Sequence, residues 1–136
     1  MEDALVKQGE QLFSEIQCSA CHIPQWTTPE SDIPALSNKT FYPYTDLLLH
    51  DMGPGLDDGV TEGAAETYEW KTPPLWGLGL SPNSQGGEYF LMHDGRARSI
   101  EEAILLHGGE AKNSREQYEA LPANEKEALL AFLESL

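Results

Sequence analysis

The stretch Cys18-Ser19-Ala20-Cys21-His22 places two cysteines two residues apart, with a histidine directly after the second. This spacing is the attachment signature of a c-type haem. Each thiol adds to one vinyl group of the porphyrin, and the adjoining His22 then supplies an imidazole nitrogen to the iron. We therefore predict one covalent haem c, held by Cys18 and Cys21, with His22 as the proximal ligand.

A cysteine pair in this spacing also occurs in other kinds of site, and the rest of the sequence excludes some of them. Cys-x-x-Cys also suits a redox dithiol, a disulfide or half of a zinc site. The chain contains no cysteine beyond these two, so a four-cysteine zinc site cannot form within it. Neither a redox dithiol nor a zinc knuckle requires the adjoining His22. A small redox or metal-binding protein that uses the Cys18/Cys21 pair is the remaining alternative to haem.

The chain is strongly acidic. Its 136 residues include 8 Lys and Arg against 23 Asp and Glu, which give a formal charge of −15. This charge argues against binding to nucleic acids or to anionic lipid surfaces, because both are themselves negative. It suits association with a basic redox partner. It equally suits a protein without such a partner, since net charge also promotes solubility.

The predicted cofactor also implies a compartment. Haem attachment to cysteine pairs takes place on the outer face of energy-transducing membranes, which in bacteria faces the periplasm. The longest apolar runs, such as Leu47-Leu48-Leu49, are far too short to span a bilayer. The first residues, Met1-Glu2-Asp3, are acidic where an export signal is basic. We therefore expect a periplasmic chain that does not span the membrane and whose export signal has been removed.

Apolar spacing predicts three helices. The first spans residues 3–17 and carries its apolar residues on one face. The second begins after Ser99, which forms a capping-box pattern with Glu102, and it ends at the Gly108-Gly109 pair. The third spans about residues 123–136, where leucines and a phenylalanine are available for packing.

The segments between these helices are predicted to be mostly irregular. Four prolines exclude a long helix from residues 23–45. Residues 46–52 are expected to form a short turn or strand, residues 60–68 a weakly patterned helix and residues 69–77 an extended chain. Residues 81–87 are predicted to form a loop, because they are rich in Ser, Asn and Gly.

Together these elements predict a mainly α fold in one domain, residues 1–136. In class I cytochromes c the first and last helices cross near the haem, with a glycine and an aromatic side chain at the contact. Gly9, Phe13 and Phe132 match those roles by position and type. The chain therefore resembles a class I cytochrome c, with long loops around one covalent haem.

A more specific resemblance rests on three separate blocks of sequence. Residues 43–53 (PYTDLLLHDMG), 72–77 (TPPLWG) and 93–104 (HDGRARSIEEAI) resemble the C-terminal cytochrome domain of the bacterial dihaem thiol oxidoreductases, which are related to the dihaem cytochrome c peroxidases. The resemblance extends from Cys18 to Leu136. Members of that family carry two haem motifs, whereas this chain carries one. The resemblance therefore implies the C-terminal half of such a protein, with a second haem domain as partner, or a single-haem relative.

The resemblance also bears on the sixth ligand of the iron. In class I topology this ligand lies between the last two helices, where His107 stands. In the dihaem peroxidases a Phe-His-x-Gly string precedes the penultimate helix, and a methionine near the end of that helix binds the electron-transfer haem. When His93-Asp94-Gly95 is aligned with that string, His107 takes the position of the methionine. We therefore favour His107 as the distal ligand.

Met52 is the rival distal ligand, because it stands among Gly and Pro residues on a segment shared with the family. Its alternative role is packing against the porphyrin. The alternative for His107 is a histidine that the helix dipole favours at a helix C-terminus. An iron with an open sixth position is a third interpretation, so the candidate metal ligands are His22, His107 and Met52.

Four further residues are candidates for contact with the haem. Trp76, together with Trp70, is predicted to wall the haem crevice. His93 is expected to donate a hydrogen bond to a propionate or to fix the turn that follows it. Arg96 is expected to pair with a propionate, since a guanidinium matches a carboxylate, and an ordinary surface role is its alternative.

These observations favour an electron-transfer module with one six-coordinate haem. The alternative is the haem domain of a dihaem peroxidase or thiol oxidoreductase-like enzyme, in which an open iron position reacts with peroxide or a thiol-derived substrate. No catalytic residue is predicted, because the chain offers no acid–base group of clear purpose beyond His93 and its neighbours. We expect any enzyme activity to belong to the complete two-haem protein.

Overall fold

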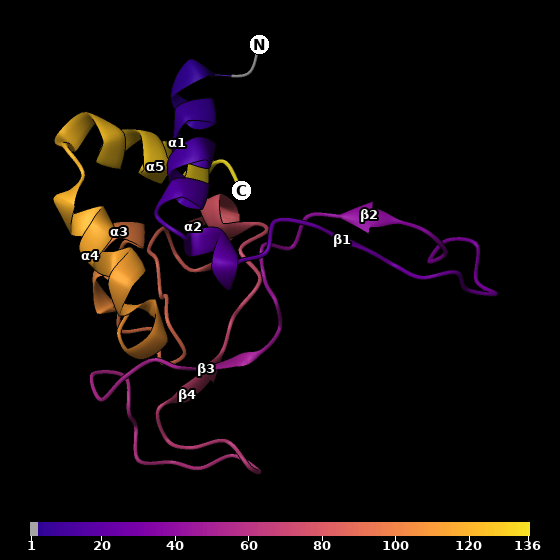
Figure 1. Ribbon diagram of the computed structural model, residues 1–136, viewed down its shortest axis with the longest axis horizontal. Coiled ribbons are helices and arrows are strands. Elements are labelled where there is room, and N and C mark those ends of the chain that lie inside the picture. Colours follow the sequence, from indigo (N-terminus) through magenta and orange to yellow (C-terminus); the bar gives the residue numbers. More distant parts are fainter. Residues whose placement is uncertain (1–2) are drawn as a thin grey trace.

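The computed structural model describes residues 3–136, and its first and last helices pack across each other (Figure 1). Helix α1 spans Ala4–Glu15 and is capped by Asp3, whose side chain accepts a hydrogen bond from the Leu5 backbone N–H. Helix α5 spans Ala123–Glu134. A Cβ atom built on Gly9 of α1 would lie 2.0 Å from the carbonyl oxygen of Ala128 in α5. Only glycine therefore allows this backbone approach, and the predicted helix contact is confirmed.

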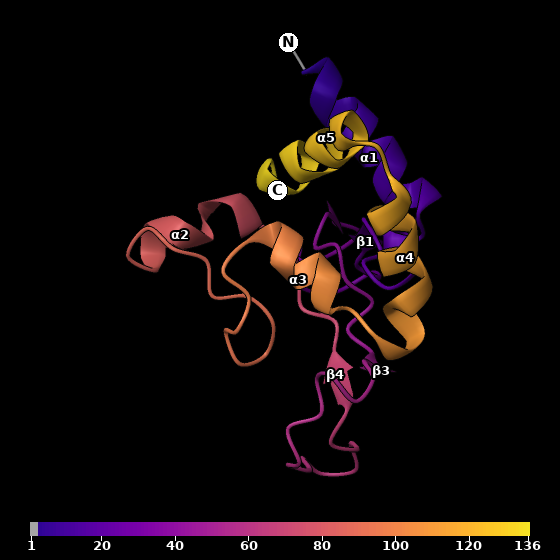
Figure 2. The same ribbon diagram turned by 90° about the vertical axis from the view of Figure 1, so that its left-hand side faces the viewer.

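The remaining helices form a run near the C-terminus, and three short helical elements lie earlier in the chain (Figure 2). Helix α3 spans Ile100–Leu106 and begins at Ser99, whose hydroxyl accepts from the Glu102 N–H. The 3-10 turn η3 (Gly109–Ala111) leads into α4 (Lys112–Ala120). The 3-10 turns η1 (Cys18–Ala20) and η2 (Leu78–Leu80), and the short helix α2 (Ser81–Ser84), complete the set.

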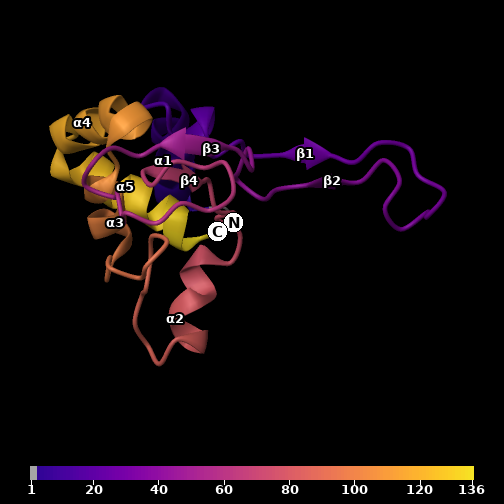
Figure 3. The same ribbon diagram turned by 90° about the horizontal axis from the view of Figure 1, so that it is seen from below.

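Two small antiparallel sheets connect these helices. Strands β1 (Trp26–Thr27) and β2 (Thr40–Phe41) form an arm that projects away from the helices (Figures 1 and 3). Strands β3 (Leu49–Asp51) and β4 (Glu69–Lys71) pair with Leu49 opposite Lys71. The β3–β4 sheet lies beside η3 at the end of the molecule away from α1, and it brings residues 46–52 close to the loop that follows α3.

The hydrophobic core lies between α1, α5 and the segments that cross them. Phe13 packs edge-on against Phe132, with ring centroids 5.4 Å apart, and Tyr44 contacts both rings. The buried members of this cluster are Leu12, Phe13, Ile16, Tyr44, Ile100, Tyr118, Ala128, Leu129, Phe132 and Leu133. Phe13 also reaches His22, at 6.3 Å between ring centroids, so the core is continuous with the predicted attachment motif.

The structure is mainly α, as predicted, and also contains two small sheets, but several local predictions were wrong. Residues 60–68 form turns rather than a helix, because no apolar face is available there to pack. Residues 81–84 are helical, with Pro82 in the first turn, where a missing N–H does no harm. Helix α3 ends at Leu106, before the glycine pair, and α4 was not predicted. No helix among the described residues is both long and apolar enough to cross a membrane.

Candidate functional site

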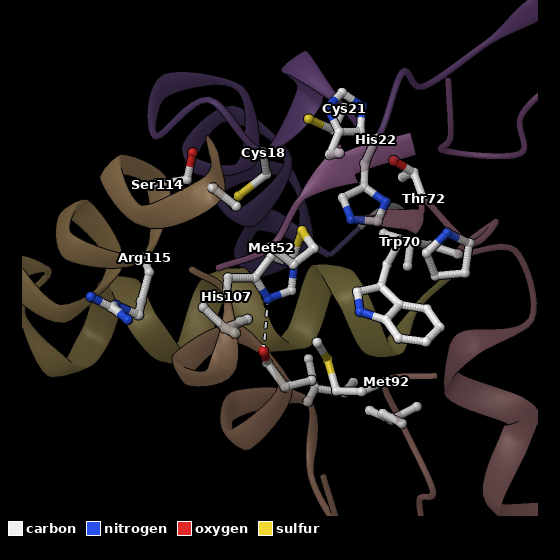
Figure 4. A pocket seen from close by; sticks show the side chains of 18 of the residues that line it. Cys18, Cys21, His22, Met52, Trp70, Thr72, Met92, His107, Ser114 and Arg115 are labelled. Atoms are coloured by element: carbon white, nitrogen blue, oxygen red, sulfur yellow. Dashed lines mark hydrogen bonds between the residues drawn. The ribbon is translucent and has the colours of Figure 1, made fainter. Parts of the chain in front are cut away.

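A cavity of about 420 Å³ lies between the helices and the β3–β4 sheet, and its lining is mostly apolar (Figure 4). Its volume is in the range of small-molecule and cofactor sites. Four groups of residues form its wall: the 13–22 region, the segments around β3 and β4, residues 90–93, and the run from α3 to α5. The lining residues whose side chains could ligate a metal, bond covalently, form hydrogen bonds or stack on a ligand are Cys18, Cys21, His22, His50, Met52, Trp70, Met92, His93, His107, Glu110 and Arg115.

Both cysteines of the predicted attachment motif line the cavity. They belong to the turn that follows α1, where Gln17 adopts a left-handed conformation with φ 68° and breaks the helix. Burial raises the pKa of the Cys18 thiol to about 12, and burial also raises the pKa of Cys21. Neither residue forms a disulfide. The structure therefore brings two protonated thiols to one side of an apolar cavity.

His22 presents one ring nitrogen to the cavity. Its Nδ1 donates a hydrogen bond to the carbonyl oxygen of Tyr44 at 3.0 Å. Tyr44 has a left-handed backbone, with φ 53°, that aims this carbonyl at the ring. Burial lowers the pKa of His22 to about 4, so the imidazole is neutral. A neutral imidazole with an oriented Nδ1–H and a free Nε2 is the form that binds metals.

His107 meets the same requirements from the other side. It caps α3 at its C-terminal end, and its Nδ1 donates to the carbonyl oxygen of Ala103 at 2.7 Å. Burial lowers the pKa of this imidazole also. The imidazole rings of His107 and His22 are therefore both neutral. Each ring is oriented by a hydrogen bond from Nδ1, which leaves its Nε2 atom available to a metal.

The separation of these two rings fits ligation of one metal between them. The ring centroids of His22 and His107 lie 6.4 Å apart. A metal–imidazole bond is about 2 Å and the ring centre lies about 1 Å further, so two imidazoles on one metal have centroids about 6 Å apart. Arg115 adds a second sign of a bound molecule. Its Nε is the only buried side-chain nitrogen or oxygen in residues 3–136 without a hydrogen-bond partner, and Arg115 lines the cavity.

Met52 lies next to His107 in the cavity (Figure 4). The backbones that carry the two side chains touch, because Cβ atoms built on Gly108 and Gly109 would lie 2.6 Å from the Met52 carbonyl oxygen and 2.1 Å from that of Asp51. Met52 and His107 are therefore neighbours on adjoining loops, and both remain candidates for the position opposite His22. The hydrogen-bonded orientation of the imidazole favours His107.

Of the two tryptophans predicted to wall the haem crevice, only one lines the cavity. Trp70 lines the cavity and stacks on His93, with ring centroids 3.4 Å apart and planes 12° apart. Trp76 does not line it. The neighbouring Leu75 does, and the Trp76 indole turns outward to Phe41 and is 57% exposed. The prediction that Trp76 walls the crevice is therefore corrected to Trp70 alone.

Arg96 also lies outside the cavity lining. Its guanidinium donates to Asp94 Oδ2 through Nε at 2.8 Å and to the Gly55 carbonyl oxygen through Nη1 at 2.7 Å. The arginine that reaches the cavity is Arg115, which the sequence analysis missed. Arg115 stands on α4, a helix with no strong apolar pattern, so no sequence signal pointed to it.

A cluster of three titratable side chains also lies at the edge of the cavity. His50 lies between Asp46 and Glu110, within hydrogen-bond distance of both carboxylates. The hydrogen bond to Glu110 and the neighbouring Asp46 raise the pKa of His50. The spacing of Asp46 and His50 was visible in the sequence, but Glu110 lies 60 residues further along and gave no signal.

Comparison with known proteins places the chain in a family. The sequence profile described as "Di-haem oxidoreductase, putative peroxidase" matches residues 1–136. The chain belongs to the di-haem oxidoreductase family. This membership confirms the resemblance recognised from the sequence blocks. No curated protein and no solved structure matches the chain.

Proposed function

We propose that this member of the di-haem oxidoreductase family is a periplasmic c-type cytochrome domain that transfers electrons through one covalent haem. Cys18 and Cys21 would hold the porphyrin through thioether bonds, and His22 and His107 would bind the iron from opposite sides. The observation that carries the proposal is the pair of neutral imidazoles, 6.4 Å apart, beside two cysteine sulfurs in one apolar cavity. A class I cytochrome c-like fold is part of this proposal, supported by the α1–α5 contact at Gly9.

The residues around the cavity suit electron transfer better than substrate turnover. Two imidazole ligands favour a low-spin iron and a lower potential than a histidine and a methionine. The haem would supply one-electron exchange at this site. The chain would supply oriented ligands through the carbonyl oxygens of Tyr44 and Ala103, and apolar walls that limit access of water. With His107 bound in the sixth position, the iron would have no place for peroxide.

An enzyme function is the second candidate, because the family description names a peroxidase. The same description specifies two haems, whereas this chain carries one Cys-x-x-Cys-His motif. We therefore assign any peroxidase or thiol oxidoreductase activity to an assembly of this chain with a second haem domain. Within that assembly, this chain would donate electrons to the second domain or accept electrons from it. The formal charge of −15 is compatible with a basic surface on a redox partner, although the charge alone does not require one.

Absorption spectra of the oxidised and reduced protein, with the mass of the denatured chain, test the proposal. Expression with the haem-maturation machinery should add the mass of one haem. The ferric protein should be low-spin and should lack the weak near-infrared band of histidine–methionine ligation. A high-spin ferric spectrum would favour the enzyme interpretation. A measured mass equal to that of the unmodified polypeptide would contradict covalent haem attachment.

A further inference from the structure

A network of charged hydrogen bonds runs along the edge of the cavity, apart from the two histidines assigned to the iron. Asp46 is buried, and its Oδ2 accepts a hydrogen bond from His50 Nε2 at 2.7 Å. The second ring nitrogen, Nδ1, donates to Glu110 Oε2 at 2.9 Å. Because both partners are carboxylates, both ring nitrogens carry a proton, and His50 is an imidazolium between two anions.

This network joins the two parts of the chain that carry the proposed axial ligands. We call residues 44–53 the rim segment. Its first residue, Tyr44, provides the carbonyl oxygen that orients His22. On the other side of the cavity, Glu110 stands three residues after His107. The hydrogen bonds of His50 therefore connect the segment behind one ligand to the loop that carries the other.

The loop after α3 has no side-chain anchor of comparable strength among the described residues. Gly108 and Gly109 lie against the backbone of the rim segment, where neither has room for a Cβ atom. Their contribution is close contact without a side chain. Glu110 adds the directed contacts, because its Oε1 also accepts from the Asp51 backbone N–H at 3.0 Å. The position of the loop thus depends on one carboxylate that is bound twice.

We propose that His50 is a positioning residue for His107. By bridging Asp46 and Glu110, it holds the loop after α3 against the rim segment and keeps the His107 imidazole facing His22. The proposal rests on the proposed haem function, because it assigns His50 to the stability of the sixth ligand. Breaking the bridge should free the loop, so that a small external ligand displaces His107 from the iron more easily.

Glu110→Ala is the test variant, because it cuts the bridge without leaving a buried charge unpaired. The Glu110 side chain is 57% exposed, and the buried Asp46–His50 pair stays intact in this variant. Glu116→Ala is the matched control. It removes the same charge from a side chain that is 53% exposed and that pairs only with residues of its own helix among the described contacts. Cyanide and imidazole are the probes, added to the ferric protein.

Glu110→Ala should bind cyanide and imidazole about two- to fivefold faster than the wild type, because a pair whose carboxylate is 57% exposed is partly screened by solvent. His50→Leu breaks the same bridge but keeps the hydrogen bond from the Asp51 N–H to Glu110, so it should also speed binding, and the effects of the two changes should not add in the double variant. Glu110→Gln keeps one acceptor oxygen for two donors, the Asp51 N–H and the His50 Nδ1–H, so it should restore only part of the slow binding. Glu116→Ala should behave as the wild type.

Three results separate this proposal from the haem assignment. A wild type that is low-spin and a Glu110→Ala variant that binds cyanide at the wild-type rate would overturn the role of His50 and leave the proposed function standing. A lower thermal midpoint for Glu110→Ala with unchanged cyanide binding would also overturn it, because the bridge would then only stabilise the fold. A high-spin wild type would instead contradict the proposed ligation itself.

Discussion

The α1–α5 contact and the rim segment hold the same cavity in different ways. The helix contact is apolar and depends on shape: Gly9 admits the backbone of α5, and Phe13 and Phe132 fill the space beside it. The rim segment is irregular and polar. Thr45 is fully buried, its hydroxyl donates to the Thr72 carbonyl oxygen at 2.7 Å, and its neighbours Tyr44 and Leu47 both have positive φ angles.

The two regions differ in how closely they fix the positions of individual atoms. The contact between the helices depends on apolar residues that recur at regular spacing in the sequence. Apolar contacts have no preferred direction, so they do not fix the positions of single atoms. The rim segment depends on directed hydrogen bonds and on backbone conformations that non-glycine residues rarely adopt. It therefore places single atoms, such as the carbonyl oxygen that orients His22. The helices build the cavity, and the rim segment sets the geometry of its ligands.

Removal of both cysteines should disturb the two regions together. Cys18→Ala/Cys21→Ala, expressed with the haem-maturation machinery, should carry no covalent haem and fold poorly, because a small core would lose the group that fills its cavity. Mass spectrometry and circular dichroism measure the two effects. A double variant that unfolds as cooperatively as the wild type would show that the helices and the rim segment close the cavity without a cofactor.

Removal of the distal ligand tests the neighbouring loops separately. His107→Ala should convert the ferric iron from low-spin to high-spin and allow cyanide or imidazole to bind readily, because the sixth position opens. Met52→Ala should leave the spectrum nearly intact. The reverse pattern in the absorption spectra would assign the ligand to Met52, on the rim segment, instead of the loop after α3.

The helix contact should respond to a single methyl group. Gly9→Ala places a Cβ atom 2.0 Å from the Ala128 carbonyl oxygen and should lower the free energy of unfolding by about 1–3 kcal/mol. Gly55→Ala is the control, since nothing lies within 4 Å of the added Cβ, and it should change stability by less than about 0.5 kcal/mol. Chemical denaturation measures both. Equal midpoints for the two variants would refute the close contact.

The rim segment should respond to the loss of one hydroxyl. Thr45→Val keeps the shape but leaves the Thr72 carbonyl oxygen and the Leu47 N–H without their partner, and should lower stability by about 1–3 kcal/mol. Thr27→Val breaks an exposed hydroxyl pair with Thr40 in the arm and should have an effect below about 0.5 kcal/mol. Similar losses in both variants would mean that burial does not distinguish the rim segment from the arm.

The smallest effect concerns Arg96, outside both regions. Its hydrogen bond and charge hold the pKa of Asp94 below the ordinary 3.8, so the carboxylate is protonated only as the pH falls through that lowered value. Arg96→Gln should raise the pKa of Asp94 toward 3.8, which an NMR titration measures, without changing the haem potential. A shift in the potential would place Arg96 against a haem propionate after all.

Much of the helical scaffold and the attachment motif could be predicted from the sequence. The Cys18–His22 spacing, the apolar faces of α1 and α5 and the role of Gly9 are local patterns, and the structure confirms the helix contact. His107 was selected by its place between helices. Trp76 was a wrong prediction because composition cannot tell which of two neighbouring side chains turns inward; Leu75 does.

The sequence by itself determined the candidate haem chemistry and the crossing helices, because both depend on residue types at fixed, short spacings. Only the tertiary structure decided which histidine faces His22, that Trp70 and Arg115 reach the cavity, and that His50 bridges Asp46 and Glu110. Those relations join residues far apart in the chain through directed hydrogen bonds and irregular backbone. A periodic pattern carries no record of them, because each depends on where the whole chain turns.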